Sequence, residues 1–176
     1  LDGLVNNAGA NFWYGVAGAK EEDVRRCFDL NFYAYWAMAQ EAYPHLKHAG
    51  GGMIVNTASI HARHTMPGVF PYNVSKAMVV ALTTSIALEW GRDNIQCVAI
   101  APGAIHTESL DRFVAEQENG EALLAGFTNR YPLGRIGRPD DVGSLIAYLL
   151  SGKNRFISGT TIYVDGGLGA ADPETE

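Results

Sequence analysis

The peptide S-I-H-A-R-H-T-M-P-G-V-F-P-Y-N-V-S-K, residues 59–76, carries the strongest chemical signal in the chain. Ser59 stands at the end of an expected strand, and Tyr72 follows thirteen residues later at the start of an expected helix. Lys76 comes four residues after Tyr72, which places the phenol and the ammonium one turn apart on one helical face. A nearby ammonium favours the phenolate, so the pattern predicts a tyrosine pKa below its ordinary value of about 10. Such a tyrosine is a candidate general acid and base.

Spacing alone leaves other interpretations open. A Tyr/Lys pair of this kind also occurs on solvated helix faces, and a lone serine at a strand end is ordinarily a turn residue. The position of Ser59 favours function, because open parallel sheets bind ligands at the carboxyl ends of their strands. A hydroxyl there can stabilise charge that develops on a substrate oxygen.

Strand-like and helix-like segments alternate along the chain. Short apolar runs typical of buried parallel strands occur at residues 1–6, 53–57, 95–101 and 160–164. Apolar periodicity predicts helices over residues 21–47, 70–90 and 140–151. In the first helix it predicts a buried stripe of Val24, Phe28, Asn31, Tyr35, Met38 and Ala42. The alternation predicts an α/β fold with a parallel sheet and right-handed crossovers.

Composition narrows the class of protein. A chain of 176 residues is most simply one domain, and an apolar fraction of 47% is enough for a core. The net charge of -6 and the lack of a Lys/Arg run argue against nucleic-acid binding. No apolar run reaches the length of about 18 residues that spans a membrane. The two cysteines share no C-x-x-C spacing, and we expect a cytoplasmic protein.

Histidine pairs raise the question of a metal site. His45 with His48, and His61 with His64, both have H-x-x-H spacing, but no Cys, Asp or Glu stands near them at ligand spacing. We therefore expect no metal.

Two segments near the carboxyl end are expected to be irregular. Residues 104–138 are expected to be irregular with helical pieces. They are too long for a plain connection, so we expect a mobile segment that closes over substrate. It contains four large side chains, Leu110, Phe113, Phe127 and Tyr131. The polar tail at residues 170–176 is expected to be disordered, which leaves 1–169 as the domain.

Six motifs in order resemble the short-chain dehydrogenase/reductase family, and 3-oxoacyl-carrier-protein reductases in particular. They are N-N-A-G at 6–9, Asn31, Ser59, Y-N-V-S-K at 72–76, P-G-A-I-H-T at 102–107 and V-D-G-G at 164–167. The resemblance runs from Leu1 to about Gly169 and implies the C-terminal part of a doubly wound, Rossmann-type parallel sheet. It also implies NAD or NADP as cofactor.

The resemblance begins at the fourth strand of the family. Members start with a strand, a G-x-x-x-G-x-G turn, a helix and two more strands, which hold the adenosine half of the dinucleotide. Glycine-rich stretches at 50–52, 134–137 and 166–169 lack the strand–turn–helix order that holds phosphate. We therefore expect the first three strands and the glycine-rich turn, roughly 70–90 residues, to be missing. The choice between NAD and NADP depends on a residue after the second strand, in that part.

The resemblance assigns roles to individual residues. It implies that Tyr72 exchanges a proton with the substrate oxygen, that Ser59 polarises that oxygen, and that Lys76 also holds the nicotinamide ribose. It implies that Asn31 holds a water in a proton relay with Lys76; the alternative is a polar residue at a helix kink. The implied cofactor-binding residues, besides Tyr72 and Lys76, are Asn7, Ala8, Gly9, Pro102, Gly103, Ile105 and Thr107.

Substrate contacts follow from proximity to these motifs. The candidates are His61, Arg63, His106, Leu110 and Phe113. Phe12, Trp13 and Tyr14 either line the substrate pocket or cover the sheet, and the sequence leaves both open.

The function predicted by resemblance is NAD(P)-dependent interconversion of a small-molecule carbonyl and a secondary alcohol. One alternative is a non-catalytic, truncated remnant or association module that cannot bind the dinucleotide tightly. Another is an epimerase or dehydratase with the same Tyr/Lys chemistry, against which N-N-A-G and V-D-G-G speak. Helices 21–47 and 70–90, with Tyr33, Trp36 and Trp90, resemble those that pair in family homodimers and homotetramers.

Overall fold

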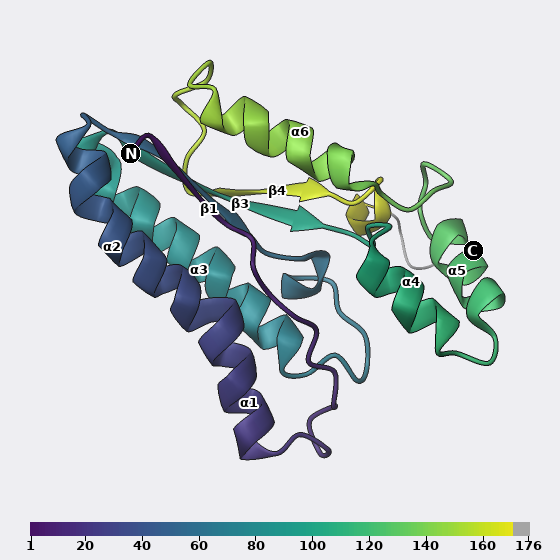
Figure 1. Cartoon of the computed structure of the whole chain (residues 1–176). Coiled ribbons are helices and arrows are strands. Elements are labelled where there is room, and N and C mark those ends of the chain that lie inside the picture. Colours follow the sequence, from purple (N-terminus) through teal and green to yellow (C-terminus); the bar gives the residue numbers. More distant parts are fainter. Residues whose placement is uncertain (171–176) are drawn as a thin grey trace.

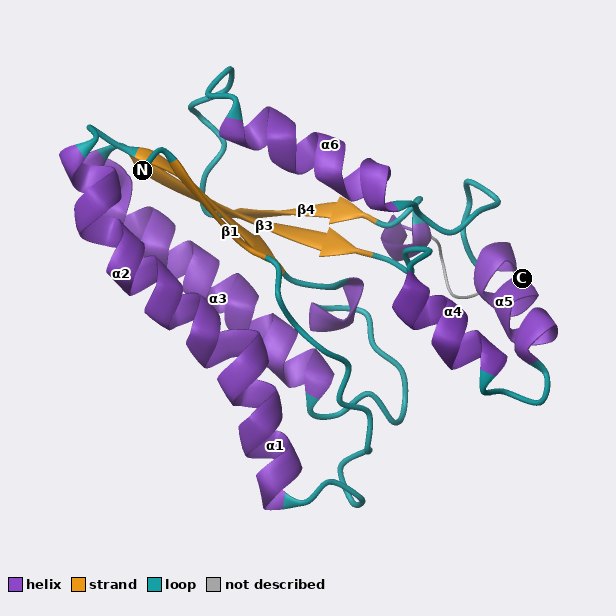
Figure 2. Cartoon of the chain, in the orientation of Figure 1, coloured by secondary structure: helices purple, strands orange, loops and turns teal. Residues whose placement is uncertain are grey.

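The computed structural model describes residues 1–170, and its centre is a four-stranded parallel sheet (Figures 1 and 2). The strands are β1 (Gly3–Asn6), β2 (Gly52–Thr57), β3 (Ile95–Pro102) and β4 (Thr160–Val164), and they lie side by side in sequence order. Register pairs Val5 with Val55, Val55 with Val98, and Ile100 with Ile162. The predicted parallel α/β sheet is confirmed for these strands.

Helices cover both faces of the sheet. The helical segment 21–48 and α3 (Tyr72–Trp90) lie on one face, and α6 (Pro139–Leu150) lies on the other, as Figure 1 shows. Beyond the carboxyl ends of β3 and β4, the segment predicted to be irregular contains α4 (Glu108–Ala115) and α5 (Gly120–Asn129). The two central strands, β2 and β3, are therefore buried on both faces, which explains why most of their residues are apolar.

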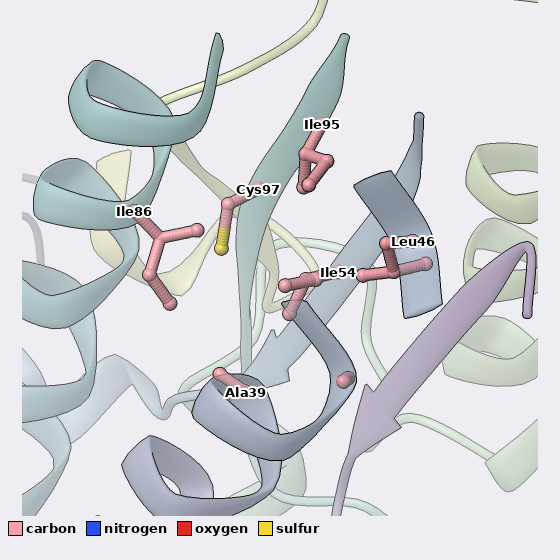
Figure 3. Close-up of a cluster of buried hydrophobic side chains, with 7 residues drawn as sticks. Ala39, Leu46, Ile54, Ile86, Ile95 and Cys97 are labelled. Carbon is pink, nitrogen blue, oxygen red and sulfur yellow. The ribbon is translucent and has the colours of Figure 1, made fainter. Parts of the chain in front are cut away.

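Each face has its own apolar core. On the side of the helical segment 21–48 and α3, Ala39 and Leu46 pack with Ile54, Ile86, Ile95 and Cys97 (Figure 3). On the side of α6, the core consists of Met53, Val55, Val98, Ile100 and Leu149. Ile54 and Val55 thus serve opposite layers, because successive side chains of a strand point to opposite faces.

The segment 21–48 is one helical run interrupted by a π-helical turn. It consists of α1 (Glu21–Phe28), the π turn Asp29–Tyr33 and α2 (Ala34–His48). Its most buried positions follow steps of four residues through the π turn and then continue on α2: Cys27, Asn31, Tyr35, Ala39, Ala42 and Leu46. The predicted place of Met38 in this stripe is wrong, since its side chain is 52% exposed. A π turn holds more residues than an α turn, so the buried face moves on to Ala39.

Three buried polar side chains join β1, β2 and α3. The Nδ2 of Asn6 donates to Asn56 Oδ1 at 2.8 Å and to the Tyr35 carbonyl at 3.3 Å. The Nδ2 of Asn56 in turn donates to Thr83 Oγ1 at 3.0 Å. Because each donor has a partner, the burial of these amides is not penalised, and the network fixes how α3 lies on the sheet.

Replacing Thr83 by Val is expected to lower the free energy of unfolding by about 1–3 kcal/mol. The substitution keeps the shape of the side chain but removes the acceptor of a buried amide donor. Thr84→Val is the matched control, since the exposed Thr84 hydroxyl makes only the same helical bond, to the carbonyl four residues earlier. Urea unfolding of the two variants measures the difference. Equal stabilities would contradict a role for the network.

The remaining boundaries differ little from those predicted. The helix predicted at 70–90 begins at Tyr72, and the one predicted at 140–151 spans 139–150. Ala170 ends a 3-10 turn, Leu168–Ala170, while the rest of the predicted disordered tail lies outside the described residues. Among residues 1–170, no helix has the length and apolarity to cross a bilayer, and no three metal-ligating side chains cluster.

Candidate active site

A cleft of about 170 Å³ lies where β1, β2 and β3 end. Residues that directly follow these strands line it, among them Asn7, Gly9, Ser59 and Gly103, and α3 adds Tyr72 and Lys76. This is the edge at which parallel α/β sheets bind their ligands. The structure thus brings three of the four predicted catalytic residues to one cleft.

Lys76 is buried beneath the cleft. Its side chain is 3% exposed, and its Nζ donates a hydrogen bond to the Thr57 carbonyl at 2.8 Å. The ammonium lies 5.3 Å from the ring centre of Tyr35 and 5.8 Å from that of Tyr72. Burial disfavours the charged form and lowers the pKa of Lys76 to about 8.

Tyr72 has a raised pKa, so the expectation of a lowered one is wrong for this structure. Burial of the phenol is the main cause, because it disfavours the phenolate. A side-chain hydrogen bond with Ser59 acts in the opposite direction and lowers the pKa. The Lys76 ammonium is hydrogen-bonded to Thr57 and lies against the face of the tyrosine ring. Spacing alone could not show that desolvation outweighs its charge.

Ser59 is held in place by the chain that follows it. Its side chain is 6% exposed, and its Oγ accepts a hydrogen bond from the His61 backbone N–H at 3.2 Å. The serine therefore caps the 3-10 turn Ile60–Ala62 while its hydroxyl faces Tyr72. Ser59 is therefore a turn residue, as one interpretation of the sequence has it. Its hydroxyl also has the position that the functional interpretation requires.

Asn31 lies behind the cleft, in the π turn, and is fully buried. Its Oδ1 accepts from Ala10 N at 3.0 Å, and its Nδ2 donates to the Ala10 carbonyl at 3.0 Å and to Ser75 Oγ at 3.2 Å. Ser75 Oγ donates to the Tyr72 carbonyl at 2.7 Å. The amide therefore connects the loop after β1 to the first turn of α3. Ser75 was not predicted, although a buried serine inside Y-N-V-S-K was a possible signal.

The loop after β1 leaves open space beside Lys76. A Cβ at Gly9 would lie 3.0 Å from Asn31 Oδ1 and 3.5 Å from Lys76 Nζ, so glycine lets the backbone approach these two side chains closely. Asn7 accepts a hydrogen bond from Thr57 Oγ1 at 3.0 Å, which is a supporting contact.

The turn after β3 is supported by Tyr131. The Ala104 N–H donates to the Tyr131 hydroxyl at 2.5 Å, and the tyrosine is 7% exposed. Tyr131 thus packs under Gly103, and closure of the segment 104–138 over substrate stays a prediction. Ile105 forms a bridge with Gly137.

Thr107 ends the same turn and caps α4. Its Oγ1 accepts from Leu110 N at 3.3 Å. This use of the oxygen leaves its O–H free to donate elsewhere.

The sequence of residues 1–169 matches the family model described as enoyl-(acyl carrier protein) reductase. Dehydrogenase/reductase SDR family member 4 of Caenorhabditis elegans is 34% identical over 168 residues, which is 95% of this chain and 64% of that protein. The chain belongs to the short-chain dehydrogenase/reductase (SDR) family.

Solved structures have the same fold as this SDR chain. The ligand-free aldohexose dehydrogenase of Thermoplasma acidophilum matches with a TM-score of 0.93 and 30% identity, over 100% of this chain and 71% of that one. Gluconate 5-dehydrogenase of Burkholderia cenocepacia J2315, in complex with NADP and tartrate, matches with a TM-score of 0.89 and 30% identity, over 98% and 66%. The SDR chain spans less than two thirds of the length of the C. elegans relative.

Of the predicted substrate residues, the structure brings His61 and Phe113 close to the cleft. The His61 ring lies 6.1 Å from that of Tyr72, and Phe113 packs edge-on against Trp13 at 6.0 Å. His106 instead pairs with Asp111 at 2.7 Å on the surface of the SDR chain. The Arg63 side chain is exposed and makes no hydrogen bond or ion pair within residues 1–170.

The open question about residues 12–14 is answered residue by residue. Phe12 is 6% exposed and belongs to the core, whereas Trp13 is 37% exposed and contacts His61 and Phe113. Tyr14 is 45% exposed. The cluster therefore divides between covering the sheet and extending the cleft.

Gly103→Ala is expected to destabilise the SDR chain by about 1–3 kcal/mol and to weaken cofactor binding. A Cβ at Gly103 would lie 2.8 Å from the Tyr131 hydroxyl and 3.3 Å from Asp165 Cα, so the turn after β3 must shift. Gly143→Ala in α6 is the control, because nothing lies within 4 Å of its Cβ, and it is expected to stabilise by about 0.5–1 kcal/mol. Thermal unfolding and a cofactor titration measure both effects. A stable Gly103→Ala variant would show that the turn has room.

Proposed function

We propose that this SDR chain serves NAD(P)-dependent interconversion of a carbonyl compound and a secondary alcohol. The observation that carries the proposal is the meeting of Ser59, Tyr72 and Lys76 in one cleft at the carboxyl ends of the strands. NAD or NADP is the cofactor of the SDR family. The structure of gluconate 5-dehydrogenase, a structural neighbour, is that of a complex with NADP. That the substrate is a 3-oxoacyl thioester stays a prediction from the sequence.

The residues around the cleft suit the nicotinamide half of the cofactor. A lysine ammonium has three N–H donors, and Lys76 uses one of them on Thr57, which leaves two for ribose hydroxyls. Gly9 keeps the space beside that ammonium open. We assign the carboxamide to the turn after β3, where Pro102, Gly103, Ile105 and Thr107 lie. When bound, the nicotinamide supplies or accepts the hydride.

The proposed proton chemistry uses Tyr72 and Ser59. Because burial raises its pKa, the Tyr72 phenol is protonated at neutral pH and is ready to give a proton to the oxygen of a carbonyl being reduced. The Ser59 hydroxyl stabilises negative charge on the same oxygen. The Lys76 ammonium, buried below the tyrosine ring, stabilises the phenolate that remains.

We assign Asn31 a positioning role. Its amide is engaged with Ala10 and Ser75, and Ser75 holds the Tyr72 carbonyl. The amide thus holds the acid/base tyrosine and the loop beside Gly9 at a fixed separation. The relay water predicted for Asn31 stays a prediction.

A direct test separates the two halves of the cofactor. Within residues 1–170, no glycine-rich stretch has the strand–turn–helix order that holds a pyrophosphate. We therefore expect reduced nicotinamide mononucleotide to bind the 176-residue chain saturably and adenosine 2′,5′-bisphosphate not to bind, as measured by calorimetry. Carbonyl-dependent oxidation of NADPH or NADH by the whole protein then tests the reaction. Failure of the mononucleotide to bind would favour the alternative of a non-catalytic association module.

We also propose that the SDR chain assembles with copies of itself. Apolar side chains are exposed along the helices predicted to pair, namely Leu30, Tyr33, Trp36, Met38 and Leu88. Trp90 is not among them, because its ring packs against Tyr43 at 4.5 Å and contacts the core. Sedimentation velocity measures the mass, and a monomer at micromolar concentration would contradict the proposal.

A further inference from the structure

Four rings from separate segments of the chain form a row that begins at Tyr72. His61 lies 6.1 Å from Tyr72, Trp13 lies 6.2 Å from His61, and Phe113 lies 6.0 Å from Trp13, measured between ring centres. Every contact is edge-to-face, with interplanar angles of 71–76°. We call these four residues the aromatic row. Edge-to-face contacts are a favourable arrangement for aromatic rings, so these contacts stabilise the positions of the four side chains.

The aromatic row extends the cleft on the side where substrate is expected. Asn11 and Ser59 line the cleft, and Trp13 and His61 each follow one of them by two residues. Trp13 also forms a backbone bridge with Pro71, the residue before Tyr72. The row therefore begins at the acid/base tyrosine and runs along the loop after β1 to α4. The cofactor turns, at Gly9 and Gly103, line the cleft itself.

The chemistry of the aromatic row is apolar and uncharged. His61 contributes the one imidazole of the row, and burial lowers the pKa of that ring, which favours its neutral form. Its Nδ1 is buried without a hydrogen-bond partner in the part of the chain that is described. One hydroxyl could pair with this nitrogen, but a charged or polyhydroxylated substituent would lose more hydration against the carbon faces of these rings than one such bond replaces. An aromatic ring would gain edge and stacking contacts.

We propose that the substrate carries an aromatic or other apolar ring next to its carbonyl carbon, and that Trp13 and Phe113 contact this ring. The inference rests on the proposed function, because it takes Tyr72 as the group that meets the carbonyl oxygen. It selects against the linear 3-oxoacyl chain expected from the sequence, since a thin chain covers less of the Trp13 and Phe113 surfaces.

Kinetics of the whole protein with a ring ketone and a linear ketone test this inference. The ring ketone is acetophenone, and the linear one is an acetoacetyl thioester. We expect kcat/KM to be about tenfold higher for acetophenone, since each ring contact is worth roughly a factor of 2–12. Trp13→Ala and Phe113→Leu are expected to lower kcat/KM for acetophenone about tenfold and for the thioester less than about threefold. Tyr148→Ala, an exposed aromatic residue of α6, is the control and should change neither.

A binding measurement distinguishes failure of the substrate class from failure of the proposed function. Calorimetry on the Tyr72→Phe variant with oxidised cofactor measures acetophenone binding without turnover. If acetophenone binds and Trp13→Ala weakens this binding about tenfold, the substrate class is supported, even if the protein reduces no carbonyl. The lack of reduction would then overturn only the proposed function. Reduction of both ketones with equal kcat/KM, unchanged by Trp13→Ala, would overturn the substrate class and leave the function standing. Absence of acetophenone binding would also overturn the class.

Discussion

Tyr72→Phe is expected to lower kcat by roughly 10²–10⁴-fold in the whole protein, which is the usual contribution of a positioned general acid. The substitution removes one oxygen and keeps the ring that packs against His61 and lies over Lys76. The loss should therefore appear in kcat, with little change in cofactor affinity or stability. Stopped-flow oxidation of NADPH with acetophenone measures the first quantity, and a cofactor titration measures the second.

Tyr148→Phe is the control for this experiment, because Tyr148 is a half-exposed tyrosine on α6, remote in sequence from the cleft residues. It should keep full turnover. Near-normal kcat for Tyr72→Phe would contradict the proposed mechanism, since the other hydroxyl that lines the cleft beside Ser59, that of Thr57, donates to Asn7. The raised pKa of Tyr72 gives a second prediction. The rate of carbonyl reduction should fall when the pH rises far enough to deprotonate the phenol.

Lys76→Met is expected to abolish turnover while leaving the protein at least as stable at neutral pH. Burial lowers the pKa of Lys76 from 10.5 to about 8, a difference that corresponds to about 3 kcal/mol against the charged form. Methionine removes this penalty, and the Thr57 carbonyl loses a donor, which costs about 1–3 kcal/mol. The expected result is a stability at pH 7 that equals or exceeds that of the unsubstituted protein by up to about 2 kcal/mol.

The pH dependence gives the sharper measurement. A lysine whose folded pKa is below its unfolded pKa destabilises fully below about pH 8, and the penalty is relieved as pH rises from about 8 to 10.5. The unsubstituted protein should therefore gain stability relative to Lys76→Met over this range. Urea unfolding at several pH values measures the difference, in which other titrating groups cancel. Exposed Lys153→Met is the control, and a pH-independent difference for Lys76→Met would contradict the buried ammonium.

The predicted elements agree with the structure where local pattern controls them. The four apolar runs form strands in parallel register, and Tyr72 does begin its helix. Met38 was misplaced because the π turn at Asp29–Tyr33 has no clear signature in apolar periodicity. The hydrogen bonds of Asn56 were not predicted, because its partners come from other segments of the chain.

The structure agrees with the sequence prediction on which residues meet in the cleft more than on the surroundings of each residue. Ser59, Tyr72 and Lys76 meet because each follows or opens an element whose place is set by the sheet. His106 was expected to face substrate, yet its imidazole pairs with Asp111, a contact that depends on how α4 turns back. Tyr131 was expected in a segment that closes over substrate, and the structure shows that it supports the turn at Gly103.

The sequence by itself determined the parallel α/β class, the order of the motifs and the i,i+4 relation of Tyr72 to Lys76, because these depend on neighbours along the chain. Only the tertiary structure decided the directions of the two pKa shifts, the hydrogen-bond partners of the Asn31 amide and the aromatic row from Tyr72 to Phe113. The physical reason is that desolvation and side-chain contacts depend on atoms brought together from distant segments. On a solvated helix, the desolvation that is the main cause of both shifts would be absent.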